Sequence, residues 1–149
     1  MPLIRVQTED FNSSDILKEL SSGRHDVGAI VSFTGLVRDL PQGGLRTLTL
    51  EHYPAMTEKA ITAIVEAATK RWSLQDVAVI HRVGELKPSD QIVLVVTLSV
   101  HRKDAFEACE YIMDYLKTRA PFWKKEQTAE SDQWVEARAV DDDALKRWD

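Results

Sequence analysis

The stretch QIVLVVTLSV, residues 91–100, is almost uniformly apolar. Such a run is typical of a strand that lies at the centre of a sheet and is buried on both faces. Before it, residues 77–83 alternate as a strand, and residues 87–90 form a turn between the two. After it, residues 104–118 carry an apolar stripe at helical spacing, and Pro121 prevents further helix. The middle of the chain is therefore predicted to be two successive strands followed by a helix.

Outward from this centre, strand alternation, helical spacing and glycine or proline breaks define the other elements. The expected strands are residues 3–8, 27–37, 45–53, 122–127 and 134–137. The expected helices are residues 13–22 and 54–72; residues 38–44 form a loop, and little structure is expected after Asp141 except at 144–148. This order contains the β-α-β-β-α-β plan of ferredoxin-like folds. The predicted fold class is therefore α+β, a mainly antiparallel sheet with helices on one face.

A chain of 149 residues, 44% hydrophobic and 29% charged, is expected to form a single globular domain, residues 1–149. Its longest aliphatic run is far too short to cross a membrane, and its first residues do not resemble a secretory signal. A lone cysteine, Cys109, leaves no partner for an intramolecular disulfide and no multi-cysteine zinc site. These features predict a cytoplasmic protein that does not bind membranes.

The net charge of −5 is concentrated near the C-terminus. Residues 126–149 hold eight acids and three bases, a difference of −5, whereas residues 1–125 are neutral with 16 of each. We interpret residues 126–149 as an acidic, partly ordered segment of the same domain. Just before it, residues 117–125 carry four basic side chains and no acid. This is either a solvated charged face or, given the interleaved aromatic residues, an ordered basic site.

Metal and nucleotide chemistry find little support in the sequence. The four histidines lie at no ligand-like spacing and no nucleotide-binding glycine motif occurs, so neither a metal nor a cofactor is expected. Cys109 falls on the apolar stripe of the predicted helix, where a cysteine is more often an inert core residue than a nucleophile. His52 and His81 lie within predicted strands and are interpreted as core or sheet histidines.

Basic residues mark the ends of several elements. His101 and Arg102 follow the apolar strand where a helix begins, a place at which main-chain amides favour anions. The alternative is a solvated strand end, with Arg102 paired to Asp104 or Glu107. Arg38, Lys117 and Lys124 each have an ordinary surface interpretation as well. Spacing alone does not bring these side chains together, but if they meet they form a cationic pocket for a phosphorylated or carboxylated ligand.

Six segments resemble one known family: FTGLVR (33–38), LEHYP (50–54), HRVGEL (81–86), HR (101–102), YLKTRAPFWKKE (115–126) and WVEAR (134–138). They are similar to segments of the large subunits of molybdopterin synthase, the MoaE family. The resemblance extends from about residue 27 to residue 148, and the block at 115–126 is long and idiosyncratic. It implies an α/β hammerhead fold with a ferredoxin-like core and a small additional β region.

The resemblance also implies an activity, that of a sulfurtransferase in molybdenum-cofactor biosynthesis. Members of the family convert cyclic pyranopterin monophosphate (precursor Z) to molybdopterin by inserting two sulfurs as a dithiolene. The sulfur comes from the Gly-Gly C-terminal thiocarboxylate of a small ubiquitin-like subunit of the MoaD type. The large subunits form a central homodimer with one small subunit at each end, so the implied assembly is a heterotetramer.

The resemblance assigns site residues by position. Arg38, His101, Arg102, Lys117 and Lys124 match the lining of the substrate and tail pocket; Leu36, Val37, Lys125 and Glu126 match its edges, and Arg138 matches a position that reaches the neighbouring subunit's pocket. Lys117 is expected to stabilise the oxyanion at the thiocarboxylate carbonyl or to transfer a proton. Lys124 is expected to support substrate binding or acid–base work. Leu36 departs from the family pattern, in which some relatives carry a lysine.

Two other functions remain open at this point. A non-catalytic module that binds a small anion would need the same cations but no sulfur donor. An RNA-binding domain of similar topology would place stacked aromatic residues on its central strands. Residues 92–96 are aliphatic and the overall charge is acidic, so no nucleic-acid partner is expected.

Overall fold

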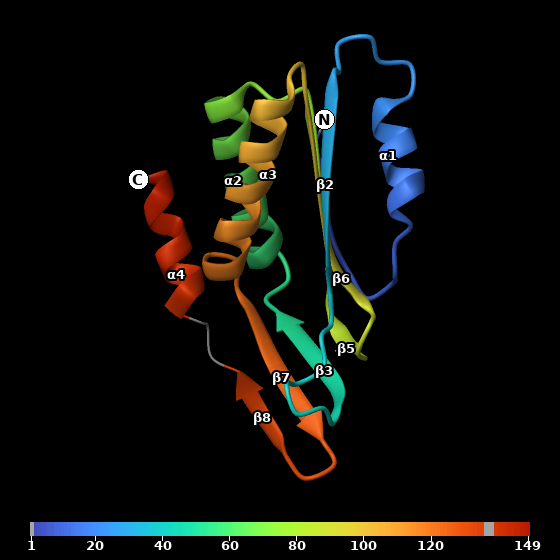
Figure 1. Cartoon of the computed structure of the whole chain (residues 1–149), viewed down its shortest axis with the longest axis vertical. Helices are drawn as coiled ribbons and strands as arrows, with labels where there is room; N and C mark the ends of the chain where they lie inside the picture. The colour runs from blue at the N-terminus through green and yellow to red at the C-terminus, as the bar shows by residue number, and fades with distance from the viewer. Residues whose placement is uncertain (1, 136–138) are drawn as a thin grey trace.

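The computed structural model describes residues 2–135 and 139–149. Its strands are β1 (Leu3–Gln7), β2 (Ala29–Leu36), β3 (Leu45–His52), β4 (Asp76–Arg82), β5 (Gly84–Leu86), β6 (Gln91–Ser99), β7 (Phe122–Thr128) and β8 (Asp132–Val135). Its helices are α1 (Ser13–Ser21), α2 (Met56–Trp72), α3 (Arg102–Thr118) and α4 (Ala139–Leu145), followed by the 3-10 turn η1 (Lys146–Trp148). Figure 1 shows a helix-covered sheet with a smaller sheet extending from one end. No helix in the described ranges is long and apolar enough to cross a membrane.

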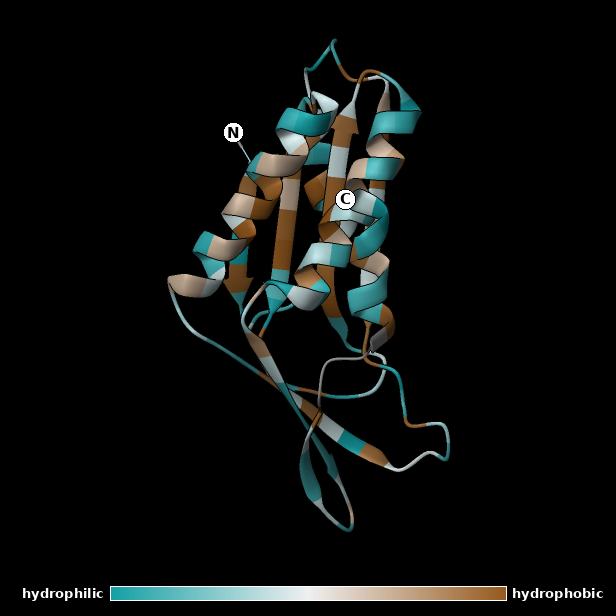
Figure 2. Ribbon diagram, turned by 90° about the vertical axis from the view of Figure 1, so that its left-hand side faces the viewer, coloured by the Kyte–Doolittle hydropathy of each residue, from teal (hydrophilic) through white to brown (hydrophobic). Residues whose placement is uncertain are grey.

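The larger sheet has the strand order β1-β4-β6-β2, in which β1 is parallel to β4 and the other pairs are antiparallel. Strand β6 lies inside this sheet, and its residues from Val93 to Ser99 are buried. Val93 and Val95 pack with residues of α2 and α3, whereas Leu94 and Val96 pack on the other face with Ile16 of α1. The prediction of a central strand buried on both faces is confirmed, and the apolar strand interior is visible in Figure 2.

The prediction that all helices cover one face of the sheet is wrong in one respect. Helix α1 covers the face opposite to α2 and α3 (Figure 1). Its Ile16 is buried against Ala78 and Ile80 of β4, because these two residues point away from α2 and α3 in the two-residue period of the strand. An apolar stripe shows that a helix covers a sheet, but it does not show which face.

The smaller sheet has the order β5-β3-β7-β8, and all its pairs are antiparallel. It is the additional β region that the family resemblance implies, and with the helix-covered sheet it confirms the α+β class. Strand β7 leaves the end of α3 and runs between β3 and β8. Of the predicted strand at 134–137, residues 134 and 135 lie in β8, and residues 136 and 137 lie outside the described ranges.

The C-terminal segment packs against α3. The sequence predicts structure at residues 144–148, and in the structure the helix α4 begins earlier, at Ala139. The Trp148 ring meets Trp72 and Tyr111 edge to face, at centroid distances of 5.5 and 5.4 Å. Its indole N–H donates to the Asp114 carboxylate at 2.6 Å, and Arg147 pairs with the same carboxylate at 2.8 Å. These contacts hold α4 and η1 beside the last turns of α3, and they depend on residues far apart in the sequence.

Candidate functional site

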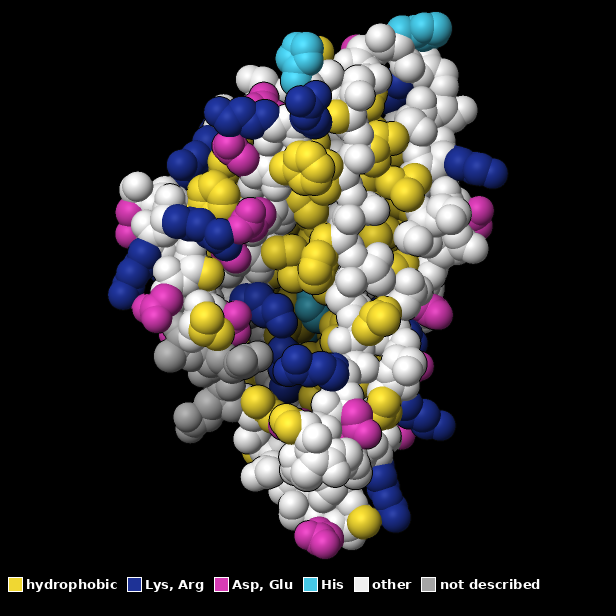
Figure 3. Space-filling model, in the orientation of Figure 1, with side chains coloured by type: hydrophobic (Ala, Val, Ile, Leu, Met, Phe, Trp, Pro, Cys, Tyr) yellow, Lys and Arg dark blue, Asp and Glu magenta, His cyan; other side chains and the backbone are white. Residues whose placement is uncertain are grey.

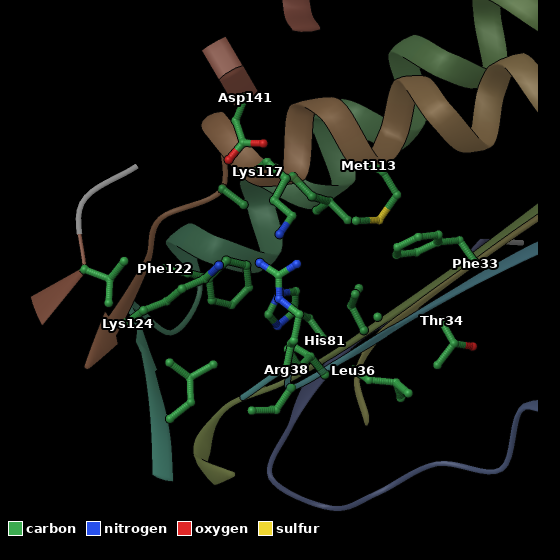
Figure 4. A pocket seen from close by; sticks show the side chains of 18 residues that line it. Phe33, Thr34, Leu36, Arg38, His81, Met113, Lys117, Phe122, Lys124 and Asp141 are labelled. Carbon is green, nitrogen blue, oxygen red and sulfur yellow. The ribbon is translucent and has the colours of Figure 1, made fainter. Parts of the chain in front are cut away.

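A cavity of about 580 Å³ lies where the two sheets meet, beside the C-terminal end of α3. Basic side chains gather around this hollow in the space-filling view, and a histidine lies deep within it (Figure 3). Its lining comes from eight elements of the chain, namely β2 and the segment after it, β3, β4, β6, the second half of α3 and the turn after it, β7, β8 and α4. The side chains labelled in Figure 4 are Phe33, Thr34, Leu36, Arg38, His81, Met113, Lys117, Phe122, Lys124 and Asp141.

Arg38 directly follows β2, on a segment held in place by main-chain bonds. The Val37 N–H donates to the Asp90 carbonyl at 2.8 Å, and the Val37 carbonyl accepts from the Ser89 N–H at 2.8 Å. Val37 is buried, whereas the side chain of Leu36 is 54% exposed at the cavity. Within the described ranges no carboxylate pairs with Arg38, so its guanidinium is available to an anionic ligand.

Lys117 and Lys124 approach each other across the turn between α3 and β7. Lys117 lies in the last turn of α3, and Lys124 lies on the face of β7 that also carries Phe122. The turn between them is fixed by the Thr57 hydroxyl, which donates to the Pro121 carbonyl at 3.0 Å. Burial lowers the pKa of Lys124, and the nearby Lys117 ammonium lowers it further.

Two carboxylates partly offset the lowering of the Lys124 pKa. Asp141 of α4 and Glu126 of β7 act in the opposite direction and raise the pKa of Lys124. Asp141 also lines the cavity, at its α4 side (Figure 4). The site therefore combines an excess of positive charge with one lysine that releases its proton more easily than usual, which suits binding of an anion and transfer of a proton.

His81 lies at the end of β4 and lines the cavity, although its side chain is largely buried. Its ring stacks on Phe122 at 3.8 Å between centroids and 18° between planes. Nδ1 lies 2.8 Å from the Arg82 carbonyl oxygen. Burial lowers the pKa of His81 to about 4, and the positive charges of Lys124 and Lys117 contribute to the shift.

The sequence interpretation of His81 as a core histidine was therefore incomplete. Its burial is confirmed, but the same side chain also reaches the cavity. Strand alternation puts His81 on the face of Val77 and Val79, which points toward α3. That alternation, together with the expectation that Lys117 ends α3, was the available sign that the histidine and the lysine would meet.

Five predicted site residues come together at the cavity, and four others do not. Leu36, Val37, Arg38, Lys117 and Lys124 line it. His101 and Arg102 stand at the other end of the 17-residue helix α3. At 1.5 Å per residue, that end lies about 22 Å from Lys117 along the helix axis. Within one chain these two side chains do not reach the cavity.

The other predicted positions lie on or after β7. Lys125 points to the opposite face of the strand from Lys124, where it pairs with Asp132 at 3.7 Å and lies 5.9 Å from the centre of the Trp134 ring. Glu126 shares the face of Lys124 but does not line the cavity. Arg138 lies outside the described residues. The alternative pairing of Arg102 with Asp104 or Glu107 is not among the ion pairs of the described residues, in which Glu107 pairs with Lys103 at 3.8 Å.

Cys109 does not line the cavity. Cys109 is buried in the core, which confirms the predicted core position, and burial raises the pKa of its thiol to about 12. Among residues 2–135 and 139–149, no group of three or more His, Cys, Asp or Glu side chains is arranged to hold a metal ion.

Comparison with known proteins identifies the family. Residues 6–119 match the family described as MoaE protein. The molybdopterin synthase catalytic subunit of Ralstonia nicotianae is 58% identical over 149 residues, which cover 99% of this chain and 85% of that protein. The protein of the same name from Yersinia pestis is 58% identical, with 97% and 96% of the two chains covered.

A solved structure agrees with the sequence matches. The molybdopterin biosynthesis MoaE protein from Burkholderia ambifaria superposes with a TM-score of 0.86 at 51% identity, covering 99% of this chain and 98% of that one. The match to the family over most of the chain, the identity to full-length relatives and the shared fold show that this chain belongs to the MoaE protein family.

Proposed function

We propose that this chain is the catalytic subunit of a molybdopterin synthase. In this function it transfers sulfur from the C-terminal thiocarboxylate of a small ubiquitin-like subunit to cyclic pyranopterin monophosphate. The observation that carries the proposal is the cavity in which Arg38, Lys117 and Lys124 converge. Both reactants are anions, and fixed cations in a partly enclosed cavity bind anions and stabilise the charge that develops during acyl chemistry.

Each cation has a role in this proposal. Arg38 lies at the cavity with no partner carboxylate in the described ranges and holds the cyclic phosphate, for which a guanidinium offers two parallel donors. Lys117 donates to the oxyanion that forms at the thiocarboxylate carbonyl. Lys124, whose pKa is lowered by burial and by Lys117, exchanges a proton with the reacting groups.

The small subunit is the proposed protein partner, and a cytoplasmic homodimer of large subunits is the proposed core of the assembly. The relatives carry the name catalytic subunit, which is the name of one part of a larger enzyme. In a dimer, His101 and Arg102 would serve a cavity only if they came from the neighbouring copy, because about 22 Å of helix separates them from Lys117 in their own chain.

The direct test of function is product formation. Cyclic pyranopterin monophosphate and the thiocarboxylated small subunit are incubated with and without this chain, and molybdopterin is measured. We expect product only when the chain is present. A folded chain that binds the small subunit but forms no product would contradict the enzymatic proposal and favour a binding module.

Mixed dimers test the arrangement of His101 and Arg102. A Lys117→Ala chain and a His101→Ala/Arg102→Ala chain carry different affinity tags and are co-expressed, and the mixed dimer is purified by both tags. If His101 and Arg102 act across the dimer, one site in each mixed dimer is intact and activity returns relative to either mutant homodimer. If activity does not return, the two residues do not act on the neighbouring cavity.

A further inference from the structure

His81 has no role in the function proposed above, although it lies at the cavity beside both lysines. It lines the same cavity as Lys117 and Lys124, and its pKa responds to the charge on each. A histidine that served packing alone would not need an open ring nitrogen in a reaction site. The two ring nitrogens of His81 have different surroundings.

The contact at Nδ1 determines which nitrogen carries the proton. The Arg82 carbonyl oxygen, 2.8 Å from Nδ1, can only accept a hydrogen bond, so Nδ1 must be the protonated nitrogen of the neutral ring. Nε2 is then left with a lone pair. No side chain or main-chain group in the described ranges bonds to Nε2. Every fully buried side-chain nitrogen in those ranges has a hydrogen-bond partner, so Nε2 is not fully buried. Because His81 lines the cavity, Nε2 reaches the accessible surface there.

The ring is also held in one orientation. Phe122 stacks on it, and strand β4 is paired on both sides, with Val6 of β1 and Val93 of β6 opposite His81. A group fixed in this way needs little reorganisation when a reactant arrives. The neutral ring thus presents a hydrogen-bond acceptor of fixed direction in a site whose lining cations, Arg38, Lys117 and Lys124, are donors.

The charges around His81 explain when it can accept a proton. Lys117 of α3, Lys124 of β7 and His52 of β3 all oppose a positive charge on the ring, and Arg38 lines the same cavity. Asp141 of α4 is the acid that lines the cavity among the described residues. An anionic substrate or tail would offset the lysines, so the basicity of His81 rises once the cavity is loaded.

The proposed reaction contains a step that needs such an acceptor. When sulfur leaves the thiocarboxylate carbonyl carbon, that carbon must gain an oxygen. After the sulfur has bonded to the pterin substrate, the tail is joined to it through an acyl thioester. Water can supply the oxygen, provided that a base removes one of its protons.

We propose that Nε2 of His81 accepts the proton from the water that releases the tail. The water oxygen bonds to the acyl carbon, the carbon–sulfur bond breaks with its electron pair on sulfur, and one water proton moves to Nε2. The second proton passes to solvent as the tail becomes a carboxylate, and the thiolate stays on the pterin. This assignment rests on the function proposed above, and it makes His81 a catalytic residue for the hydrolytic half of the reaction.

The first test examines the ring itself and needs no substrate. Nitrogen-15 NMR of the histidine-labelled full chain at pH 7 reports which nitrogen of His81 is protonated, with a His81→Gln chain to assign the signal. We expect the neutral ring with the proton on Nδ1. A proton on Nε2, or a charged ring in the empty cavity, would overturn the proposal whatever the enzyme's activity.

The second test follows the reaction by mass spectrometry. His81→Gln keeps an amide near the position of Nε2 but cannot accept a proton, so we expect turnover to fall about 100-fold with an unchanged KM for the small subunit. The small subunit should accumulate as a covalent adduct with the mass of the pterin added. His25→Gln, which removes an exposed histidine between α1 and β2, is the matched control and should behave like the unmodified chain.

The outcomes separate the two proposals. If the unmodified chain forms no molybdopterin, the proposed function fails. If it forms product and a folded His81→Gln chain, checked by thermal unfolding, turns over equally fast without adduct, only the role of His81 fails. A His81→Gln chain that loses turnover without accumulating adduct also contradicts the role, because the block then precedes hydrolysis.

Discussion

Strands β6 and β7 both lie inside a four-stranded sheet, yet their side chains differ greatly in exposure. In β6 every residue from Val93 to Ser99 is buried, with α2 and α3 over one face and α1 over the other. In β7 no residue is fully buried, and Trp123 is 40% exposed. The larger sheet therefore carries most of the apolar burial. The smaller sheet places Phe122 and Lys124 at a cavity that a ligand can enter.

The comparison predicts that substitutions in β6 reduce stability, whereas substitutions at the junction of the two sheets reduce activity. Helix α3 connects the two regions, since its stripe from Ala105 to Ile112 packs into the core and Lys117, in its last turn, faces the cavity.

Leu94→Ala tests the contribution of β6. Leu94 is fully buried against Ile16 and Ile80, so we expect a loss of about 3–5 kcal/mol in the free energy of unfolding. Denaturant unfolding gives this value, and activity per folded molecule should change little. Trp134→Ala on the exposed strand β8 is the control and should cost less than about 1 kcal/mol. Similar losses from the two variants would contradict the difference between the sheets.

Lys117→Ala tests the junction. The side chain is exposed to the cavity rather than packed in the core, so stability should be unchanged. We expect the rate of sulfur transfer to fall about 100- to 1000-fold, because the variant lacks a hydrogen-bond donor to the oxyanion. Lys103→Ala, at the exposed start of α3, should retain full activity. Near-normal turnover by Lys117→Ala would overturn the role assigned to this lysine.

Acid unfolding tests the burial of His81. Its pKa is about 4 in the folded chain and 6.5 when unfolded, so the unfolded state binds more protons between these values. Stability should therefore rise with pH from about 4 to 6.5, by about 3 kcal/mol from this group, and level off above. His81→Gln should flatten the rise measured by unfolding at several pH values, and His25→Gln should not. A profile that is equally steep in His81→Gln would contradict the burial of a neutral ring.

Trp148→Ala tests the C-terminal contact with α3. It removes the edge-to-face contacts with Trp72 and Tyr111 and the bond to Asp114, for an expected loss of about 2 kcal/mol in unfolding free energy. Turnover should fall only a few-fold, since α4 brings Asp141 to the cavity but no proposed reaction step uses it. Arg71→Ala, which removes a cation that lies 5.5 Å from the centre of the same ring, should have a smaller effect on stability. An unchanged melting temperature in Trp148→Ala would show that the contact contributes nothing.

Much of the fold could be predicted from the sequence because its signals are local. The apolar run at 91–100 predicted β6, the helical stripe predicted α3, and Pro121 predicted the end of that helix. The position of α1 on the opposite face could not be read in the same way, since an apolar stripe fits either face of a sheet. The docking of Trp148 depended on a partner surface made by two other helices.

The candidate site shows the same difference between local signals and tertiary packing. The sequence by itself determined the chemistry that is present: a basic segment at 117–125, an arginine after a strand, a cysteine in an apolar stripe and a specific family resemblance. Only the tertiary structure decided which cations share a cavity. It joined Arg38, Lys117 and Lys124, separated His101 and Arg102 by the length of a helix, and added His81. The physical reason is that residue type and periodicity act over a few residues, whereas a cavity is formed where strands and helices distant in sequence pack together.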